Sequence, residues 1–114
     1  MNPLVGAIAA GCPAVLKPSE VSANVAIAFA DLFPKYLDPN AYAVINGAAP
    51  ETTYLLSLKW DFILFTGSSE VGRIVASAAA KNTTPCALEL GGVSPAVVAD
   101  DVDIDLAAKR ILWG

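Results

Sequence analysis

The sequence contains no histidine, only two cysteines and only seven basic residues. Without histidine, no imidazole can activate a thiol nucleophile, and a zinc site would depend on carboxylates and two distant thiols. The basic residues are scattered, and only Lys109 and Arg110 are adjacent, so there is no basic stripe for nucleic acid. The sequence therefore predicts no metal centre and no nucleic-acid partner.

Cys12 and Cys86 stand among apolar residues without the spacing of metal ligands. Such sparse cysteine usage is typical of a reducing compartment, so we expect two buried thiols and a cytoplasmic protein. Residues 1–16 carry no charge, but two prolines and two glycines interrupt them, and they are too short to cross a bilayer. We expect a short helix and a buried strand there, and no membrane segment.

The chain is 55% hydrophobic and 16% charged, with a mean hydropathy of +0.56 and a net charge of −4. These values exclude a disordered chain. A parallel sheet covered on both faces would explain them, because its strands are almost entirely apolar. Membership of a larger body, with surfaces buried elsewhere, would also explain them, and we expect both.

Short apolar runs alternate with segments of helical periodicity. The strands are predicted at 13–17, 41–45, 62–65, 86–90 and 96–99, and the helices at 4–10, 20–36, 50–58, 70–81 and 101–113. This alternation predicts an α/β fold: a Rossmann-like, mostly parallel sheet with helices on both faces. Ser19 is expected to cap the second helix, in which apolar residues recur on one face: Val21, Val25, Ala28, Phe29, Leu32, Phe33 and Tyr36.

Polar and glycine residues follow the predicted strands. They are Lys17, Asn46-Gly47, Thr66-Gly67-Ser68, and Glu89 with Gly91-Gly92. Right-handed crossovers bring the carboxyl ends of parallel strands to one edge, where ligands of such sheets bind. We therefore expect a ligand site at this edge.

Two segments at that edge allow both a binding role and a plain structural role. In 67–73, "GSSEVGR", the amides of a helix start could hold phosphate, although Arg73 and Ile74 replace the Lys and Ser/Thr of a Walker A loop; the alternative is an ordinary helix cap. In 16–20, "LKPSE", a lysine and an acid could together hold a diol such as ribose. The alternative is a solvated lysine and a carboxylate that favours the helix dipole.

Glu89 interrupts the apolar strand "CALEL" and precedes two glycines that allow close approach. A partly desolvated carboxylate there would suit a general base, and a structural carboxylate is the alternative. Cys86 lies three residues earlier, so the two side chains should point to opposite faces of the strand. We therefore expect Cys86 in the core and not in catalysis.

Four segments taken in order resemble the aldehyde dehydrogenase superfamily, especially its fatty-aldehyde, class-three-like branch and fungal relatives. They are "NPLVGAIAAGCPAVLKPSE", "FTGSSEVGRIV", "TPCALELGGVSPAVV" and "DDVDIDLAAKRILWG". The resemblance covers residues 1–114 but only the middle of a family member. It implies a partial NAD(P)-binding domain of an enzyme that oxidises aldehydes to carboxylic acids.

The resemblance implies NAD as cofactor, with NADP as an alternative, and contacts at nine positions: Lys17, Glu20, Phe65, Gly67, Ser68, Val71, Gly72, Leu90 and Gly91. Lys17 and Glu20 would hold the adenosine ribose, the acid disfavouring a 2′-phosphate. Gly67 and Ser68 would face the pyrophosphate, with Val71 beneath. Glu89 would be the general base that activates water against the thioester.

Some features of the family are missing. Val93 stands where the family usually has lysine, and the family's nucleophilic cysteine, oxyanion-hole asparagine, substrate tunnel and oligomerisation strands have no counterpart in residues 1–114. We expect an aldehyde as substrate and a homo-oligomer for the full-length family member, but no turnover by this chain alone. The competing hypotheses are a standalone nucleotide-binding module and an inert truncated fragment.

Overall fold

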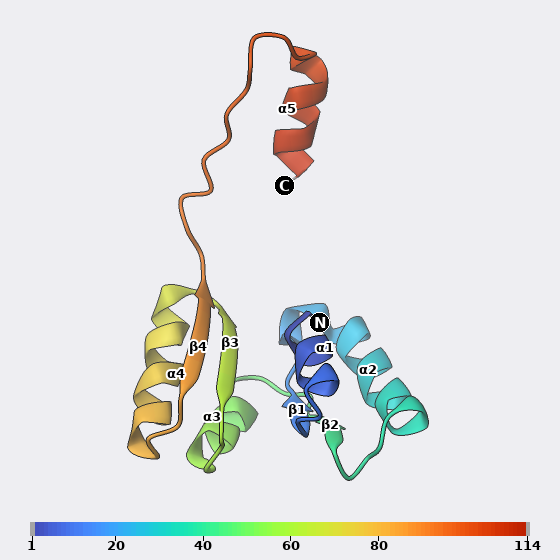
Figure 1. Ribbon diagram of the computed structural model, residues 1–114, viewed down its shortest axis with the longest axis vertical. Helices are drawn as coiled ribbons and strands as arrows, with labels where there is room; N and C mark the ends of the chain where they lie inside the picture. The colour runs from blue at the N-terminus through green and yellow to red at the C-terminus, as the bar shows by residue number, and fades with distance from the viewer. Residues whose placement is uncertain (1, 114) are drawn as a thin grey trace.

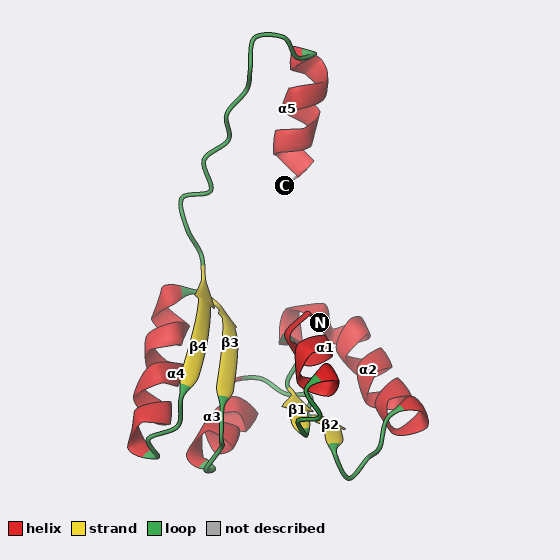
Figure 2. Ribbon diagram, viewed as in Figure 1, coloured by secondary structure: helices red, strands yellow, loops and turns green. Residues whose placement is uncertain are grey.

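The computed structural model describes residues 2–113, which form five α-helices, one short 3-10 helix and four strands (Figure 1, Figure 2). The helices are α1 (Asn2–Ala9), η1 (Glu20–Ser22), α2 (Ala23–Tyr36), α3 (Ala49–Ser57), α4 (Ser69–Lys81) and α5 (Ile104–Trp113). The strands are β1 (Ala14–Leu16), β2 (Tyr42–Val44), β3 (Ile63–Gly67) and β4 (Cys86–Leu90). These elements lie within a few residues of the predicted ones.

The strands pair in parallel, β1 with β2 and β3 with β4. The predicted α/β class with parallel strands is therefore confirmed. The two pairs do not form one sheet, because no strand within residues 2–113 is hydrogen-bonded to both (Figure 2). Helix α2 packs on β2, whereas α4 packs on β3 and β4 and α3 packs on α4.

The strand predicted at 96–99 was wrong. These residues belong to the extended segment 91–103 that leads to α5, and they have no neighbouring strand (Figure 1). An isolated apolar run cannot form a strand, because its backbone donors and acceptors need a partner. Val97, at 94% exposure, illustrates the lack of one.

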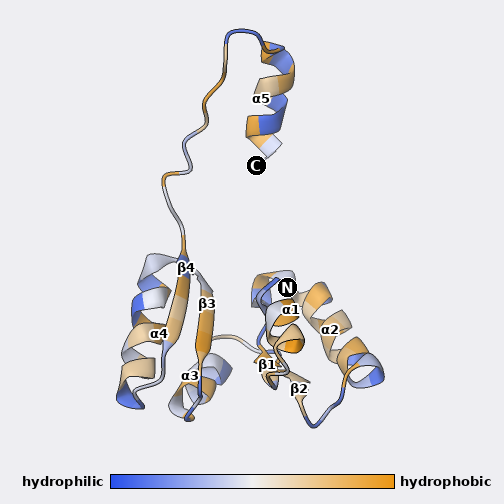
Figure 3. Ribbon diagram, in the orientation of Figure 1, coloured by the Kyte–Doolittle hydropathy of each residue, from blue (hydrophilic) through white to orange (hydrophobic). Residues whose placement is uncertain are grey.

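The buried apolar side chains form two small groups, one beside each strand pair: Leu4, Ala26 and Phe33, and Val75 and Ala79. The radius of gyration is 17.8 Å, against about 13 Å for a compact domain of this length. The described chain is thus open, and apolar colouring extends over exposed parts of α2 and the 91–103 segment (Figure 3).

Two expectations about burial need correction. The predicted apolar face of the second helix is largely uncovered: Phe33 is buried, but Val21 is 90% and Tyr36 79% exposed. Cys12 is exposed and Cys86 is half-buried, so the prediction of two buried thiols was wrong for Cys12. In both cases, no described element packs over the side chain. Among residues 2–113, no helix is long and apolar enough to cross a membrane.

Candidate functional site

Lys17 follows β1 and joins three segments of the chain. Its ammonium donates to the carbonyl of Pro18 at 2.8 Å and to the carbonyl of Gly47 at 3.1 Å, and it forms an ion pair with Glu20 Oε2 at 3.5 Å. Ser19 stabilises the turn between them by accepting a bond from the Val21 amide at 3.3 Å. The structure therefore brings together Lys17 and Glu20, the two residues predicted to hold a diol.

Glu20 pairs with the Lys17 ammonium, and a second carboxylate, Glu51, lies against Gly47, whose carbonyl accepts from that ammonium. The pKa of Glu20 is lowered by a hydrogen bond from its own backbone amide, and then by the charge of Lys17 and its hydrogen bond. The pKa of Glu51 is lowered by bonds from its own amide and that of Ala48, with a further contribution from Lys17. Both groups are therefore ionised at neutral pH. Sequence reasoning did not identify Glu51 as part of this cluster.

The start of α4 forms the second part of the predicted edge. Ser68 caps the helix, because its Oγ accepts from the Val71 amide at 3.3 Å and its carbonyl accepts from the Gly72 amide at 2.9 Å. The amides of Ser69 and Glu70 precede the first intrahelical bond, so they are available to an anion at the positive end of the helix dipole.

Phe65 and Gly67, both on β3, lie immediately before this helix start. A Cβ atom on Gly67 would lie 2.6 Å from Cζ of Phe65, so the aromatic ring covers the glycine closely. A larger residue where the strand meets the cap would displace this ring. The ring and the helix start form neighbouring parts of one surface.

Glu89 lies near the carboxyl end of β4, in register with Thr66 of β3. Leu90 packs against α4: a Cβ atom on Gly72 would lie 2.8 Å from Cδ2 of Leu90. Gly91 has open space where a Cβ would be placed, so a ligand can approach its backbone. The end of β4 thus lies beside the start of α4.

Glu89 itself is exposed in the described chain, so its predicted partial desolvation was wrong here. No described element covers this end of β4, because residues 91–103 lead away from it (Figure 1). Cys86 is the first residue of the same regular strand, and strand alternation places the two side chains on opposite faces.

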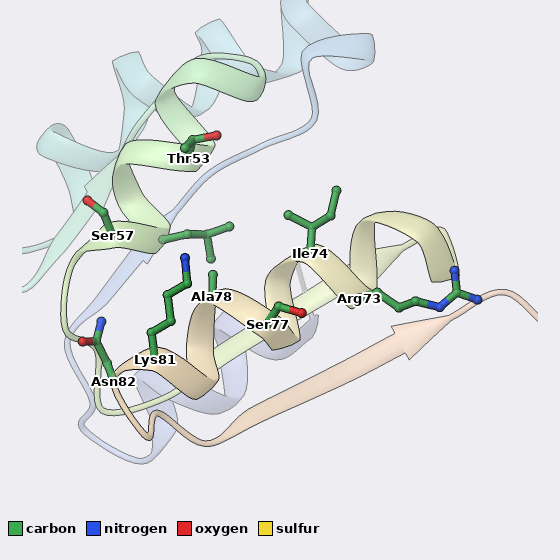
Figure 4. A pocket seen from close by; sticks show the side chains of 9 residues that line it. Thr53, Ser57, Arg73, Ile74, Ser77, Ala78, Lys81 and Asn82 are labelled. Atoms are coloured by element: carbon green, nitrogen blue, oxygen red, sulfur yellow. The ribbon is translucent and has the colours of Figure 1, made fainter.

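A hollow of about 600 Å³ lies elsewhere, between α3 and α4 (Figure 4). It is lined mainly by apolar and small side chains, with Arg73 and Lys81 along α4. None of the predicted site residues lines it. This groove is therefore a feature of helix packing and not the predicted strand-end site.

The structure thus forms two clusters of predicted site residues. One surrounds Lys17 at the β1–β2 ends, and the other comprises the start of α4 with the ends of β3 and β4. No hydrogen bond or ion pair within residues 2–113 joins them directly. Helix α3 links them, because it begins beside the Lys17 cluster and packs against α4.

Comparison with known proteins gives a consistent result. Residues 1–114 match the aldehyde dehydrogenase family. The chain is 56% identical to mouse "Aldehyde dehydrogenase family 3 member A2", 54% to rat "Aldehyde dehydrogenase, dimeric NADP-preferring" and 52% to "Beta-apo-4'-carotenal oxygenase" of Neurospora crassa. Each match includes 100% of this chain but only 24%, 25% and 21% of the relative, respectively.

Solved structures agree. The substrate-bound AldH of Staphylococcus aureus is 45% identical, with a TM-score of 0.84 over 97% of this chain and 24% of that one. An aldehyde dehydrogenase of Mycobacterium tuberculosis complexed with NAD+ is 40% identical, with a TM-score of 0.71 over 85% of this chain and 20% of that one. The open arrangement of the elements is therefore also found within larger, solved proteins. The chain belongs to the aldehyde dehydrogenase family and spans about a quarter of the length of the curated relatives it matches.

Proposed function

We propose that residues 1–114 form part of the NAD(P)-binding domain of an enzyme that oxidises an aldehyde to a carboxylic acid. The observation that carries this proposal is the Lys17–Glu20 pair at the end of β1, together with a capped helix start at the end of β3. Two similar proteins support the cofactor class. The rat relative is named as NADP-preferring, and the Mycobacterium tuberculosis structure is a complex with NAD+.

In this proposal, Lys17 and Glu20 bind the adenosine ribose. The ammonium donates to a hydroxyl oxygen and the carboxylate accepts a hydroxyl proton, which matches the two hydrogen-bonding roles of a diol. Lys17 is suited to this task, since its side chain is only 21% exposed and is held by two carbonyls. The remaining contact with Glu20 is the longest of the three and is the one that a ribose would replace.

The pyrophosphate would lie at the start of α4, beside Gly67 and Ser68. Free amides and the helix dipole provide favourable groups for an anion there, and Val71 and Gly72 form the first turn beneath it. Phe65, Leu90 and Gly91 would face the rest of the cofactor, which, when bound, accepts the hydride that the aldehyde loses. The open backbone at Gly91 allows that approach.

Glu89 is proposed as the general base. A carboxylate can take a proton from the water that attacks the enzyme-bound acyl group, which releases the acid product. The nucleophile that carries the acyl group is not assigned to either cysteine of this chain. Cys86 is separated from Glu89 by strand alternation, and Cys12 lies before β1, next to neither cluster.

The test uses the purified chain with NAD and a long-chain aldehyde, with absorbance of the reduced cofactor as the readout. We expect NAD binding in titration calorimetry but no steady reduction. Steady reduction of NAD would contradict the proposal that neither Cys12 nor Cys86 is the nucleophile. Absence of binding at millimolar NAD would contradict the cofactor groove itself.

The open fold favours a second candidate, an inert fragment that requires further chain to cover its apolar faces. The radius of gyration of 17.8 Å and the exposure of large side chains such as Trp113, at 92%, support it. Aggregation and non-cooperative melting, together with no NAD binding, would favour this candidate. Cooperative melting that shifts upward with NAD would favour the cofactor-binding domain, because a ligand stabilises the state that binds it.

A further inference from the structure

The position of the Lys17 ammonium depends on the Gly47 carbonyl. An ammonium has three donors, and the Lys17 Nζ contacts Pro18, Gly47 and Glu20. Pro18 is adjacent in sequence and Glu20 lies three residues on, so within residues 2–113 Gly47 is the partner that ties Lys17 to the segment after β2. Any residue that fixes Gly47 therefore also fixes the ammonium.

Glu51 fixes Gly47 and the turn after it. Its Oε2 accepts a hydrogen bond from the Ala48 amide at 2.8 Å, and its side chain lies against Gly47, where a Cβ atom would come 2.6 Å from the Cβ of Glu51. Ala48 occupies the N-cap of α3 but has no side-chain acceptor. The Glu51 carboxylate thus supplies the acceptor for the Ala48 amide that the N-cap side chain lacks.

The charges around Lys17 are unbalanced. Glu20 pairs with the Lys17 ammonium at 3.5 Å, and the Glu51 side chain lies against Gly47, whose carbonyl accepts from the same ammonium. Both carboxylates are ionised, so the cluster carries a net negative charge. A ribose hydroxyl is neutral, but a phosphate monoester adds about −1.5 to −2 charges at neutral pH. Because charges within about 8 Å interact at physiological salt, a phosphate on the ribose would be repelled by Glu51 as well as by Glu20.

We propose that Glu51 positions Lys17 through the Gly47–Ala48 turn and lowers the affinity of the site for a 2′-phosphorylated ribose relative to an unphosphorylated one. This inference rests on the proposed cofactor-binding function, and it adds a residue on a second element to the choice between NAD and NADP. The two roles separate experimentally. Glutamine keeps an oxygen that accepts from Ala48 but removes the charge, whereas alanine removes both.

The experiment is titration calorimetry of the 114-residue chain with NAD and with NADP, at low and at high salt. We expect Glu51→Gln to retain NAD affinity and to shift the NADP-to-NAD affinity ratio toward NADP by about threefold or more at low salt, with a smaller shift at high salt. We expect Glu51→Ala to weaken binding of NAD as well. Asp31→Asn, an equal change of charge on the exposed surface of α2, should leave both affinities unchanged.

Circular dichroism of each variant controls for folding. If the parent chain binds NAD but Glu51→Gln leaves the ratio unchanged, the inference is overturned and the proposed function stands. If Glu51→Gln weakens both cofactors equally while its spectrum stays that of the parent, the charge effect is also overturned, since a purely structural role would do this. If the parent chain binds neither cofactor at millimolar concentration, the proposed function fails and the inference fails with it.

Discussion

Replacement of Gly72 by alanine tests the contact between α4 and β4 that brings two parts of the candidate site together. Alanine is favoured over glycine within a helix by about 0.5–1 kcal/mol. At Gly72, however, the new Cβ would lie 2.8 Å from Cδ2 of Leu90, well inside van der Waals contact. The contacted atom is the end of a flexible side chain that is 41% exposed, so Leu90 can move aside at a cost of about 1 kcal/mol, the low end of the range for overpacking. We therefore expect this cost to offset the helix gain and leave the stability of Gly72→Ala within about 0.5 kcal/mol of the parent.

Gly6→Ala is the matched control, because Gly6 also lies within a helix but has open space around the position of a Cβ. We expect this variant to be stabilised by about 0.5–1 kcal/mol. Urea unfolding followed by circular dichroism measures both, and Gly72→Ala introduced into a Leu90→Ala background should be stabilising, because the offsetting contact is gone. If Gly72→Ala were as stabilising as Gly6→Ala, the close packing of β4 against α4 would be refuted.

Three further predictions concern the core, the lysine and pH. Val75→Ala should destabilise the chain by about 1–3 kcal/mol, since Val75 is only 2% exposed, whereas Val97→Ala at 94% exposure should change stability by less than about 0.5 kcal/mol. Lys17→Met should weaken NAD binding about tenfold in calorimetry, because it removes a charged donor, while the exposed control Lys35→Met should not. The pKa of Glu51 is lowered in the folded chain, so its contribution to stability is complete above the unfolded pKa of about 4.3 and disappears as the pH falls through the lower folded pKa. Unfolding measured at several pH values should show this loss in the parent chain and a smaller one in Glu51→Gln; equal profiles would count against the stabilising hydrogen bond from the Ala48 amide.

Local signals explain most of what the sequence predicted correctly. The strand Cys86–Leu90 and the helix Ser69–Lys81 follow from an apolar run and from helical spacing between Ser68 and Asn82, which cap that helix. Strand formation at 96–99 depends on a distant partner, which sequence spacing does not reveal. The predicted burial of the apolar face of α2 was wrong for the same reason, as the 90% exposure of Val21 shows.

The candidate site likewise contains residues that local sequence signals identify and one, Glu51, that they did not. Lys17 and Ser68 were found because each stands at the junction of a strand and a helix, where polar residues are conspicuous. Glu51 lies within the helix predicted at 50–58 and was not named as a site residue, because its contact with the Gly47–Ala48 turn becomes visible only with side chains in place. A glutamate three residues after the N-cap was the signal that could have pointed to it.

The most direct test of the cofactor groove is an amide NMR titration of the ¹⁵N-labelled chain with NAD. We predict that the shifted amides concentrate in three segments, 17–20, 65–72 and 89–91, which include the nine proposed cofactor positions and Glu89. The groove between α3 and α4 provides an internal comparison, since none of its lining residues belongs to that set. Shifts centred on that groove, or no shifts at millimolar NAD, would contradict the assignment of the strand ends as the cofactor site.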